Sequence, residues 1–155
     1  MTSVNADLEA RQAVVDTLTE LFLATDRRDW PAVEGCFAET VTFDMTSLAG
    51  GQPARLTPRD ISSAWTQGLA PIESVHHQAG NFRVRIDGNE ASAFCYAIAY
   101  HYRRVVSGRN LRTFVGSYDF HLARDGAQRW RIDLFRFNIK FLDGNLDLHS
   151  EDAAG

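Results

Sequence analysis

Apolar residues in the first part of the chain repeat with the period of a helix. Between residues 8 and 26 they recur every three or four positions, on a stripe of Leu8, Val15, Leu18 and Phe22 supported by Val14 and Leu21. This spacing predicts an α-helix with one apolar face. Asp26 is the next position on the stripe, so we expect its carboxylate to point toward the apolar interior. The alternative is that Asp26 caps the helix or pairs with Arg27 or Arg28.

Two shorter helices are predicted before the β-rich half of the chain. Asp29 is a typical N-cap for a helix over residues 30–37. Thr57 and Asp60 have the spacing of a capping box, which indicates the start of a third helix. Between these helices, residues 40–45 are β-branched and aromatic enough to form a short strand.

The second half of the chain has the alternating pattern of β-strands separated by turn signals. Strands are predicted over residues 76–86, 91–106, 111–124 and 129–141. In the last of them the apolar residues change parity, which a one-residue bulge near residues 134–136 explains. Helices followed by a bent antiparallel sheet predict an α+β half-barrel whose mouth holds a small ligand.

Length and composition limit the alternatives. The 155 residues suit one domain, with polar tails at residues 1–7 and 144–155 that we expect to be flexible. A net charge of −4 and dispersed arginines disfavour nucleic-acid binding. No apolar run has membrane length, and no signal segment is evident at the N-terminus. With Cys36 and Cys95 in apolar surroundings, the sequence favours a cytoplasmic protein with free thiols.

Two adjacent histidines, His76 and His77, open the first long strand. Histidine exchanges protons near neutral pH, so either is a candidate general base. Neighbouring strand residues point to opposite faces, so only one of the two is expected to face a pocket. For the same reason they are poorly placed to bind one metal ion together, and no cluster with zinc spacing occurs. The pattern predicts a proton-transfer site without metal or cofactor.

The order of these motifs resembles the SnoaL-like branch of the nuclear transport factor 2-like superfamily. The resemblance covers nearly the whole chain and is carried by Asp26-Arg27-Arg28-Asp29-Trp30, Val41-Thr42-Phe43-Asp44, His76-His77-Gln78-Ala79-Gly80-Asn81 and Val84-Arg85-Ile86-Asp87-Gly88. It implies a single SnoaL-like domain over residues 1–155. It also implies a cone-shaped half-barrel in which three N-terminal helices wrap a curved, mainly antiparallel sheet.

The superfamily includes scytalone dehydratase, hexachlorocyclohexane dehydrochlorinase and polyketide cyclases. The first two use a histidine shortly before the Asn or Gly of this strand, oriented by an aspartate that ends the first helix. His77, four residues before Asn81, and Asp26 match those positions. The resemblance therefore implies a lyase, isomerase or cyclase that abstracts a proton from a small, apolar or aromatic, cyclic ligand. We expect the two side chains to lie about 2.6–3.2 Å apart or to be joined by one water.

Other residues are weaker candidates for the site. Asp44 stands in a Thr-Phe-Asp setting like the general base of ketosteroid isomerases, but Leu21 replaces the tyrosine that donates to the oxyanion there. Further candidates for binding the substrate are His76, Trp65, Tyr96, Tyr100, Tyr118, Arg136 and Asn138. For each, a purely structural role is at least as well supported.

A function of a different class is also compatible with the sequence. The chain could be a non-catalytic ligand-binding or dimerisation module that resembles the small subunits of ring-hydroxylating dioxygenases. Both faces of the strand over residues 91–106 carry apolar side chains, so neither is expected to be fully solvated. The outer face is therefore predicted to form a homodimer or homotrimer interface.

Overall fold

A computed structural model describes residues 4–155 of the chain. Its elements are α1 (Val4–Arg27), α2 (Trp30–Cys36), β1 (Phe37–Asp44), α3 (Thr46–Ala49), β2 (Ala54–Leu56), α4 (Pro58–Leu69), β3 (Ser74–Asp87), β4 (Glu90–Tyr102), β5 (Leu111–Arg124) and β6 (Trp130–Gly144). Residues 1–3 of the expected N-terminal tail lie outside the described part. Among residues 4–155, no helix is long and apolar enough to cross a membrane.

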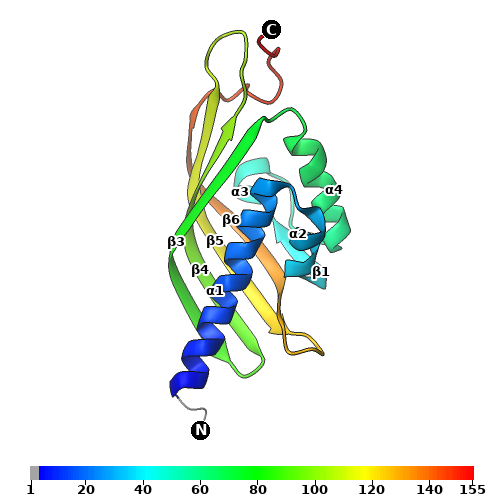
Figure 1. Cartoon of the computed structure of the whole chain (residues 1–155), viewed down its shortest axis with the longest axis vertical. Coiled ribbons are helices and arrows are strands. Elements are labelled where there is room, and N and C mark those ends of the chain that lie inside the picture. The colour runs from blue at the N-terminus through cyan, green and yellow to red at the C-terminus, as the bar shows by residue number, and fades with distance from the viewer. Residues whose placement is uncertain (1–3) are drawn as a thin grey trace.

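The strands form one curved sheet in the order β2-β1-β6-β5-β4-β3. All neighbouring strands are antiparallel except β1 and β6, which run parallel. Helix α1 crosses one face of this sheet, with α2 and α4 beside it (Figure 1). The predicted α+β fold is therefore confirmed, and the three expected helices are α1, α2 and α4. The sequence did not predict α3 or β2, which are too short to show a period.

The caps of the two shorter helices follow the sequence pattern. The Asp29 carboxylate accepts a hydrogen bond from the backbone of Ala32 at the start of α2. The Thr57 hydroxyl accepts the backbone N–H of Asp60, and the Asp60 carboxylate accepts the backbone N–H of Thr57, which completes a capping box on α4.

The apolar face of α1 differs in part from the predicted stripe. Its buried residues are Ala10, Val14, Leu18, Leu21, Phe22, Ala24 and Thr25. Leu8 remains 58% exposed and Val15 is half-buried. The helix also begins at Val4, before the expected start at Leu8. The small side chain of Ala10 faces the interior, whereas Leu8 lies off this face. Hydrophobicity alone would have predicted the opposite, with Leu8 buried and Ala10 exposed.

The inner face of β4 carries small side chains. Ala91, Ala93, Cys95, Ala97 and Ala99 are all buried in the main core. Burial raises the pKa of the Cys95 thiol to about 12, and burial together with Glu20 raises that of Cys36 to about 11. Both thiols are free and in their unreactive protonated form at neutral pH.

Bulges bend the strands that border the site, at two positions in the pairing of β5 with β6 and at one in β3. In the pairing of β5 with β6, His121 lies opposite Leu134 and the next residue, Leu122, lies opposite Ile132. Asp133 therefore has no pairing partner in the register with β5 and is the bulged residue of β6. This bulge lies one residue from the predicted position and explains the change of parity. The bulge in β3 follows Gly80, where Asn81 adopts a φ of 57°.

The C-terminal tail is packed, which corrects the expectation that residues 144–155 are flexible. Leu148 is fully buried in a small cluster with Leu69, Ile72, Val75 and Val105. Ala153 pairs with Val105 in an isolated bridge, and the tail lies beside the β4–β5 connection (Figure 1). The tail is mostly polar, so its one anchoring apolar residue, Leu148, did not stand out in the sequence.

Candidate active site

A cavity of about 350 Å³ lies between the helices and the inner face of the sheet. Most of its walls are apolar. Its lining residues are Leu21, Phe22, Thr25, Met45, Leu48, Ala64, Trp65, Gly68, Leu69, His77, Ala99, His101, Arg112, Phe114, Tyr118, Phe135, Phe137 and His149. They come from α1, α3 with its N-cap, α4, strands β3 to β6 and the C-terminal tail, so much of the chain contributes to one site.

Asp26 and His77 form a hydrogen-bonded pair at this cavity. The Nδ1 atom of His77 lies 2.6 Å from Oδ1 of Asp26, and the His77 backbone N–H donates to Oδ2 at 2.8 Å. The side chains are only 12% and 16% exposed. An ionised carboxylate accepts but does not donate, so we assign the imidazole proton to Nδ1. Within residues 4–155 nothing hydrogen-bonds to Nε2, which is then a free base.

The neighbours of Asp26 are engaged elsewhere. Arg27 pairs with Glu20 on the surface of α1. Arg28 has a φ of 58° and donates to the backbone carbonyls of Leu69 and Ile72, which ties the end of α1 to the end of α4. Asp26 therefore pairs with neither arginine, and its carboxylate is left to orient His77.

Phe22 and Asp26 lie one helical turn apart on α1, and both contact His77. The Phe22 ring stacks on the imidazole with centroids 5.5 Å apart. Residues four apart on a helix lie on one face, which is why both reach the same side chain. The imidazole is fixed by a carboxylate at its edge and an aromatic ring on its face.

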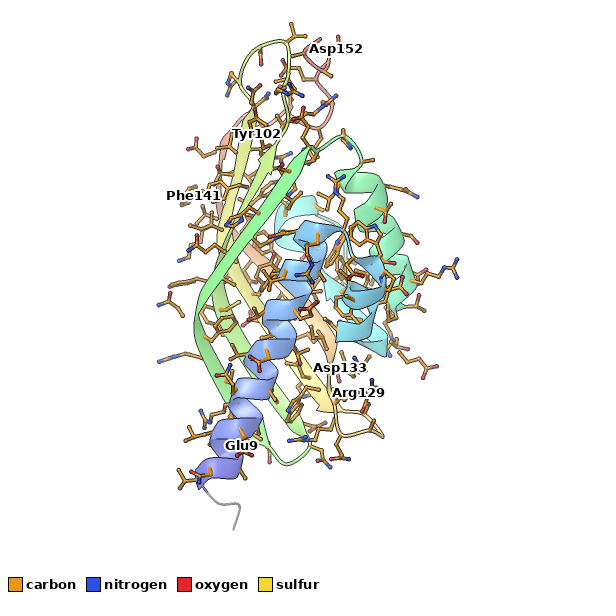
Figure 2. All side chains as sticks on the ribbon, viewed as in Figure 1. Glu9, Tyr102, Arg129, Asp133, Phe141 and Asp152 are labelled. Atoms are coloured by element: carbon orange, nitrogen blue, oxygen red, sulfur yellow. The ribbon has the colours of Figure 1, made fainter. Side chains whose placement is uncertain are left out.

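His76, Tyr96 and Tyr100 do not line the cavity. This agrees with the expectation that only one of the two adjacent histidines faces the pocket, but it removes His76 and the two tyrosines from the candidates for binding the substrate. His76 is exposed and its ring lies 6.4 Å from that of Tyr100. Tyr96 is 45% exposed, with the Lys140 ammonium 4.1 Å from its ring centroid. These residues alternate with the buried small residues of β4 or with His77, so they lie on the outer face of the sheet. Phe141 lies on the same outer side, away from the helices (Figure 2).

Asp44 and Arg136 also lie outside the cavity and bind each other. Arg136 Nε donates to Asp44 at 2.9 Å. The hydroxyl and backbone N–H of Thr46 donate to the same carboxylate at 2.6 and 3.0 Å. These bonds, the Thr46 hydroxyl first, lower the pKa of Asp44 below its ordinary value. Asp44 is therefore a poor base, and the prediction of a ketosteroid isomerase-like role fails.

Asn138 is the third polar candidate on β6 that the structure places elsewhere. Its amide donates to Asp119 at 2.9 Å and to Ser117 at 3.4 Å. It shares strand parity with Arg136, whereas Phe135 and Phe137 face the cavity. Its role is to satisfy polar groups of β5.

Trp65 and Tyr118, two of the candidates for binding the substrate, line the cavity. Trp65 packs against Phe37, Phe43 and Phe135, with centroids 5.7–6.3 Å apart. Burial raises the pKa of Tyr118 above its ordinary value, so its phenol stays protonated. Whether either ring contacts a substrate remains a prediction.

Three polar residues at the cavity were not identified from the sequence. His101 Nδ1 lies 3.0 Å from His149 Nε2, and Arg112 Nη1 lies 3.4 Å from His149 Nδ1. Burial first, and then the nearby charges of His149, His77 and Arg112, lower the pKa of His101 to about 3. The alternation of β4 places His101 in phase with Ala99, which was the one available signal. His149 lies in the segment that was expected to be flexible.

Comparison with known proteins identifies relatives of this fold. A model of the SnoaL-like domain matches residues 6–136. A comparison with curated proteins found no significant match. The Kfla4162 protein from Kribbella flavida has a similar structure, with a TM-score of 0.84 and 19% identity over 90% of this chain and 95% of that one.

Two similar structures carry names of activities. A provisionally named scytalone dehydratase from Novosphingobium aromaticivorans has a TM-score of 0.79 and 12% identity, over 99% of this chain and 98% of that one. The hexachlorocyclohexane dehydrochlorinase LinA-type3 from Novosphingobium barchaimii has a TM-score of 0.75 and 10% identity, over 99% of both chains. At such low identities the likeness shows the fold and not the activity.

Proposed function

The chain belongs to the SnoaL-like family, and on that premise we propose that it is a small-molecule lyase, isomerase or cyclase that uses His77 to abstract a proton from carbon. The observation that carries the proposal is the Asp26–His77 pair on the wall of an apolar cavity. The fold is shared with proteins named for dehydration and dehydrochlorination, both of which are eliminations. An elimination from a carbon acid requires such a base.

In this mechanism Nε2 of His77 accepts the substrate proton while Nδ1 continues to donate to Asp26. The imidazolium that forms is stabilised by the carboxylate beside it. The backbone bond from His77 fixes the second carboxylate oxygen, so neither partner has to rotate during the reaction. The apolar walls keep water away and strengthen these electrostatic interactions.

The cavity limits the size of the substrate. A volume of about 350 Å³ lies at the lower end of the range for small-molecule pockets, roughly 300–1,000 Å³. Aromatic side chains such as Phe22, Phe114 and Phe137 make up much of its wall. A compound with one or two rings fits this space and chemistry.

Hydrogen–deuterium exchange tests proton abstraction without knowledge of the final product. The wild-type protein is incubated in D₂O with a panel of ring compounds: 2-tetralone, a cyclic β-hydroxyketone and a chlorinated cyclohexane. NMR follows deuterium incorporation, and chloride or water loss is measured in parallel. We expect acceleration over the protein-free rate with at least one compound. If none is accelerated and the panel nevertheless binds, the non-catalytic ligand-binding alternative is favoured.

We also propose that the outer face of the sheet forms a homodimer interface. Tyr96, Tyr102 and Phe141 are 45%, 39% and 56% exposed there, and an interface on this face would remove their rings from water. Light scattering at micromolar concentration should give twice the mass of the chain. Substitution of Phe141 by lysine should shift the population toward monomer. A monomeric wild-type protein would contradict the interface, and a mass of three chains would favour a trimer.

A further inference from the structure

In the group formed by Arg112, His149 and His101, the donor and the acceptor of each hydrogen bond can be assigned. Arginine only donates, so Arg112 Nη1 donates to Nδ1 of His149. Neutral His149 then carries its proton on Nε2 and donates it to Nδ1 of His101. Neutral His101 in turn carries its proton on Nε2, to which no residue in the described part of the chain is hydrogen-bonded. The chain of three residues therefore ends in a free donor at the cavity.

The Arg112 guanidinium is only partly hydrogen-bonded. Its Nε atom is buried and has no hydrogen-bond acceptor within residues 4–155. The guanidinium lies over the Phe114 ring, 4.8 Å from its centroid, and Asp147 is the carboxylate whose charge acts on it. An unpaired buried donor is destabilising, and more so when it is charged. The guanidinium as a whole lines the cavity, so its positive charge is available to an anionic ligand there.

We propose that Arg112, His101 and His149 bind an anionic oxygen of the ligand, so that the substrate is a small ring compound bearing a carbonyl or carboxylate group. The Arg112 guanidinium supplies the positive charge at the cavity wall and His101 Nε2–H supplies a donor, and His149 is a positioning residue that links them. This assignment rests on the proposed function and extends it to a substrate class. The cavity then holds both a base, His77, and a separate group of donors.

The arrangement suits enolisation. When His77 takes a proton from the carbon next to a carbonyl, the C–H bond breaks and its electron pair forms the C=C bond of an enolate. The carbonyl π pair moves to the oxygen, and the proton resides on Nε2 of His77. His77 becomes cationic as the oxygen becomes anionic. Donors fixed at that oxygen before the reaction stabilise its developing charge.

The C-terminal tail holds His149 in place. Leu148 is fully buried beside it, and Arg103 donates to the Leu148 carbonyl at 3.0 Å. Asn145 is also buried and binds the carbonyl of Arg109 and the carboxylate of Glu151. The tail is therefore anchored on both sides of the residue that completes the donor group.

Binding of matched ligands tests the proposal. Isothermal titration calorimetry compares 2-naphthoate with its neutral analogue 2-naphthamide on the full-length protein. We expect the wild type to bind 2-naphthoate at least tenfold more tightly. Arg112→Met should remove this preference and leave 2-naphthamide binding within twofold. Arg83→Met, which removes an exposed arginine from β3, is the matched control and should leave the preference unchanged.

The enolate is tested with 4-nitrophenol, whose phenolate has a distinct absorption spectrum. Bound to the wild type near pH 6, it should shift toward the phenolate form, and this shift should be absent in Arg112→Met. A preference for 2-naphthoate alone indicates a substrate carboxylate, and a phenolate shift alone indicates a carbonyl that enolises. Equal affinities without a phenolate shift, or no binding of any of the three compounds, overturn the proposal.

Two further variants keep the result interpretable. If Arg112→Met does not fold, His149→Gln should reduce the preference for 2-naphthoate at least threefold, and an unchanged preference overturns the role of His149. His77→Gln should lose proton exchange but keep the preference for 2-naphthoate. A wild type that shows the preference but exchanges no proton refutes the proposed function and leaves the anion site standing.

Discussion

Replacing Asp26 with asparagine is expected to lower the rate of proton abstraction by about 10²–10⁴-fold, the usual contribution of a general base. The carboxylate now accepts from Nδ1 of His77. An asparagine amide can instead donate to Nδ1, which moves the imidazole proton to Nε2. With Nε2 protonated, His77 has no free lone pair toward the substrate. The deuterium-exchange rate of the best compound in the panel measures this loss.

Two companion variants define the result. His77→Gln removes the base and should lose a similar factor, and the double variant should be little worse than either single one because the two residues act as a unit. Asp16→Asn changes an exposed carboxylate on the same helix and should keep the wild-type rate. If Asp26→Asn folds and exchanges protons at the wild-type rate, the dyad is not the catalytic group.

The pairing of Asp26 with His77 was accessible from the sequence because both positions follow local periodicity. An acid in phase with an apolar helical stripe and a histidine at the head of an alternating strand each indicate one face of one element. The resemblance to the family supplied the pairing between them. The two residues lie 51 positions apart in the chain, and nothing local in the sequence indicates the 2.6 Å contact that the structure shows.

The choice of face on β4 was not accessible from the sequence. Both faces are apolar, and the larger aromatic side chains, including Tyr96 and Tyr100, were the natural choice for a ligand pocket. The structure instead turns Ala97 and Ala99 inward. Small side chains leave space for α1 and for the cavity, so volume and not hydrophobicity decides which face is inside.

The donor group of the cavity was missed for a different reason. His101, Arg112 and His149 come from two strands and a tail, and no pair among them has a motif spacing. The chain of hydrogen bonds that leaves a free donor exists only when all three side chains are in contact. A polar tail is usually mobile, and a single leucine, Leu148, changes that outcome by filling a gap between other elements.

Replacing Gly116 with alanine is expected to destabilise the protein by about 3 kcal/mol, the upper end of the usual cost of overpacking. Gly116 lies on β5 where the pairing with β6 shifts. A methyl group there would overlap the backbone carbonyl of Asn138 and lie 2.9 Å from the Phe137 ring. Backbone cannot rotate away as a flexible side chain can. For a chain of this size the melting temperature should fall by roughly 6–12 °C.

Gly68→Ala is the matched control, because Gly68 lies in α4 and a methyl group there meets nothing within 4 Å. Alanine is favoured over glycine within helices by roughly 0.5–1 kcal/mol, so this variant should be as stable as the wild type or more so. Thermal melting followed by circular dichroism measures both. Because Phe137 also lines the cavity, Gly116→Ala should weaken 2-naphthamide binding as well. A Gly116→Ala protein that melts within 1–2 °C of the wild type, less than about 1 kcal/mol, would mean that β6 can move away from β5 at little cost, and that the close contact of the two strands does not fix the shape of the cavity.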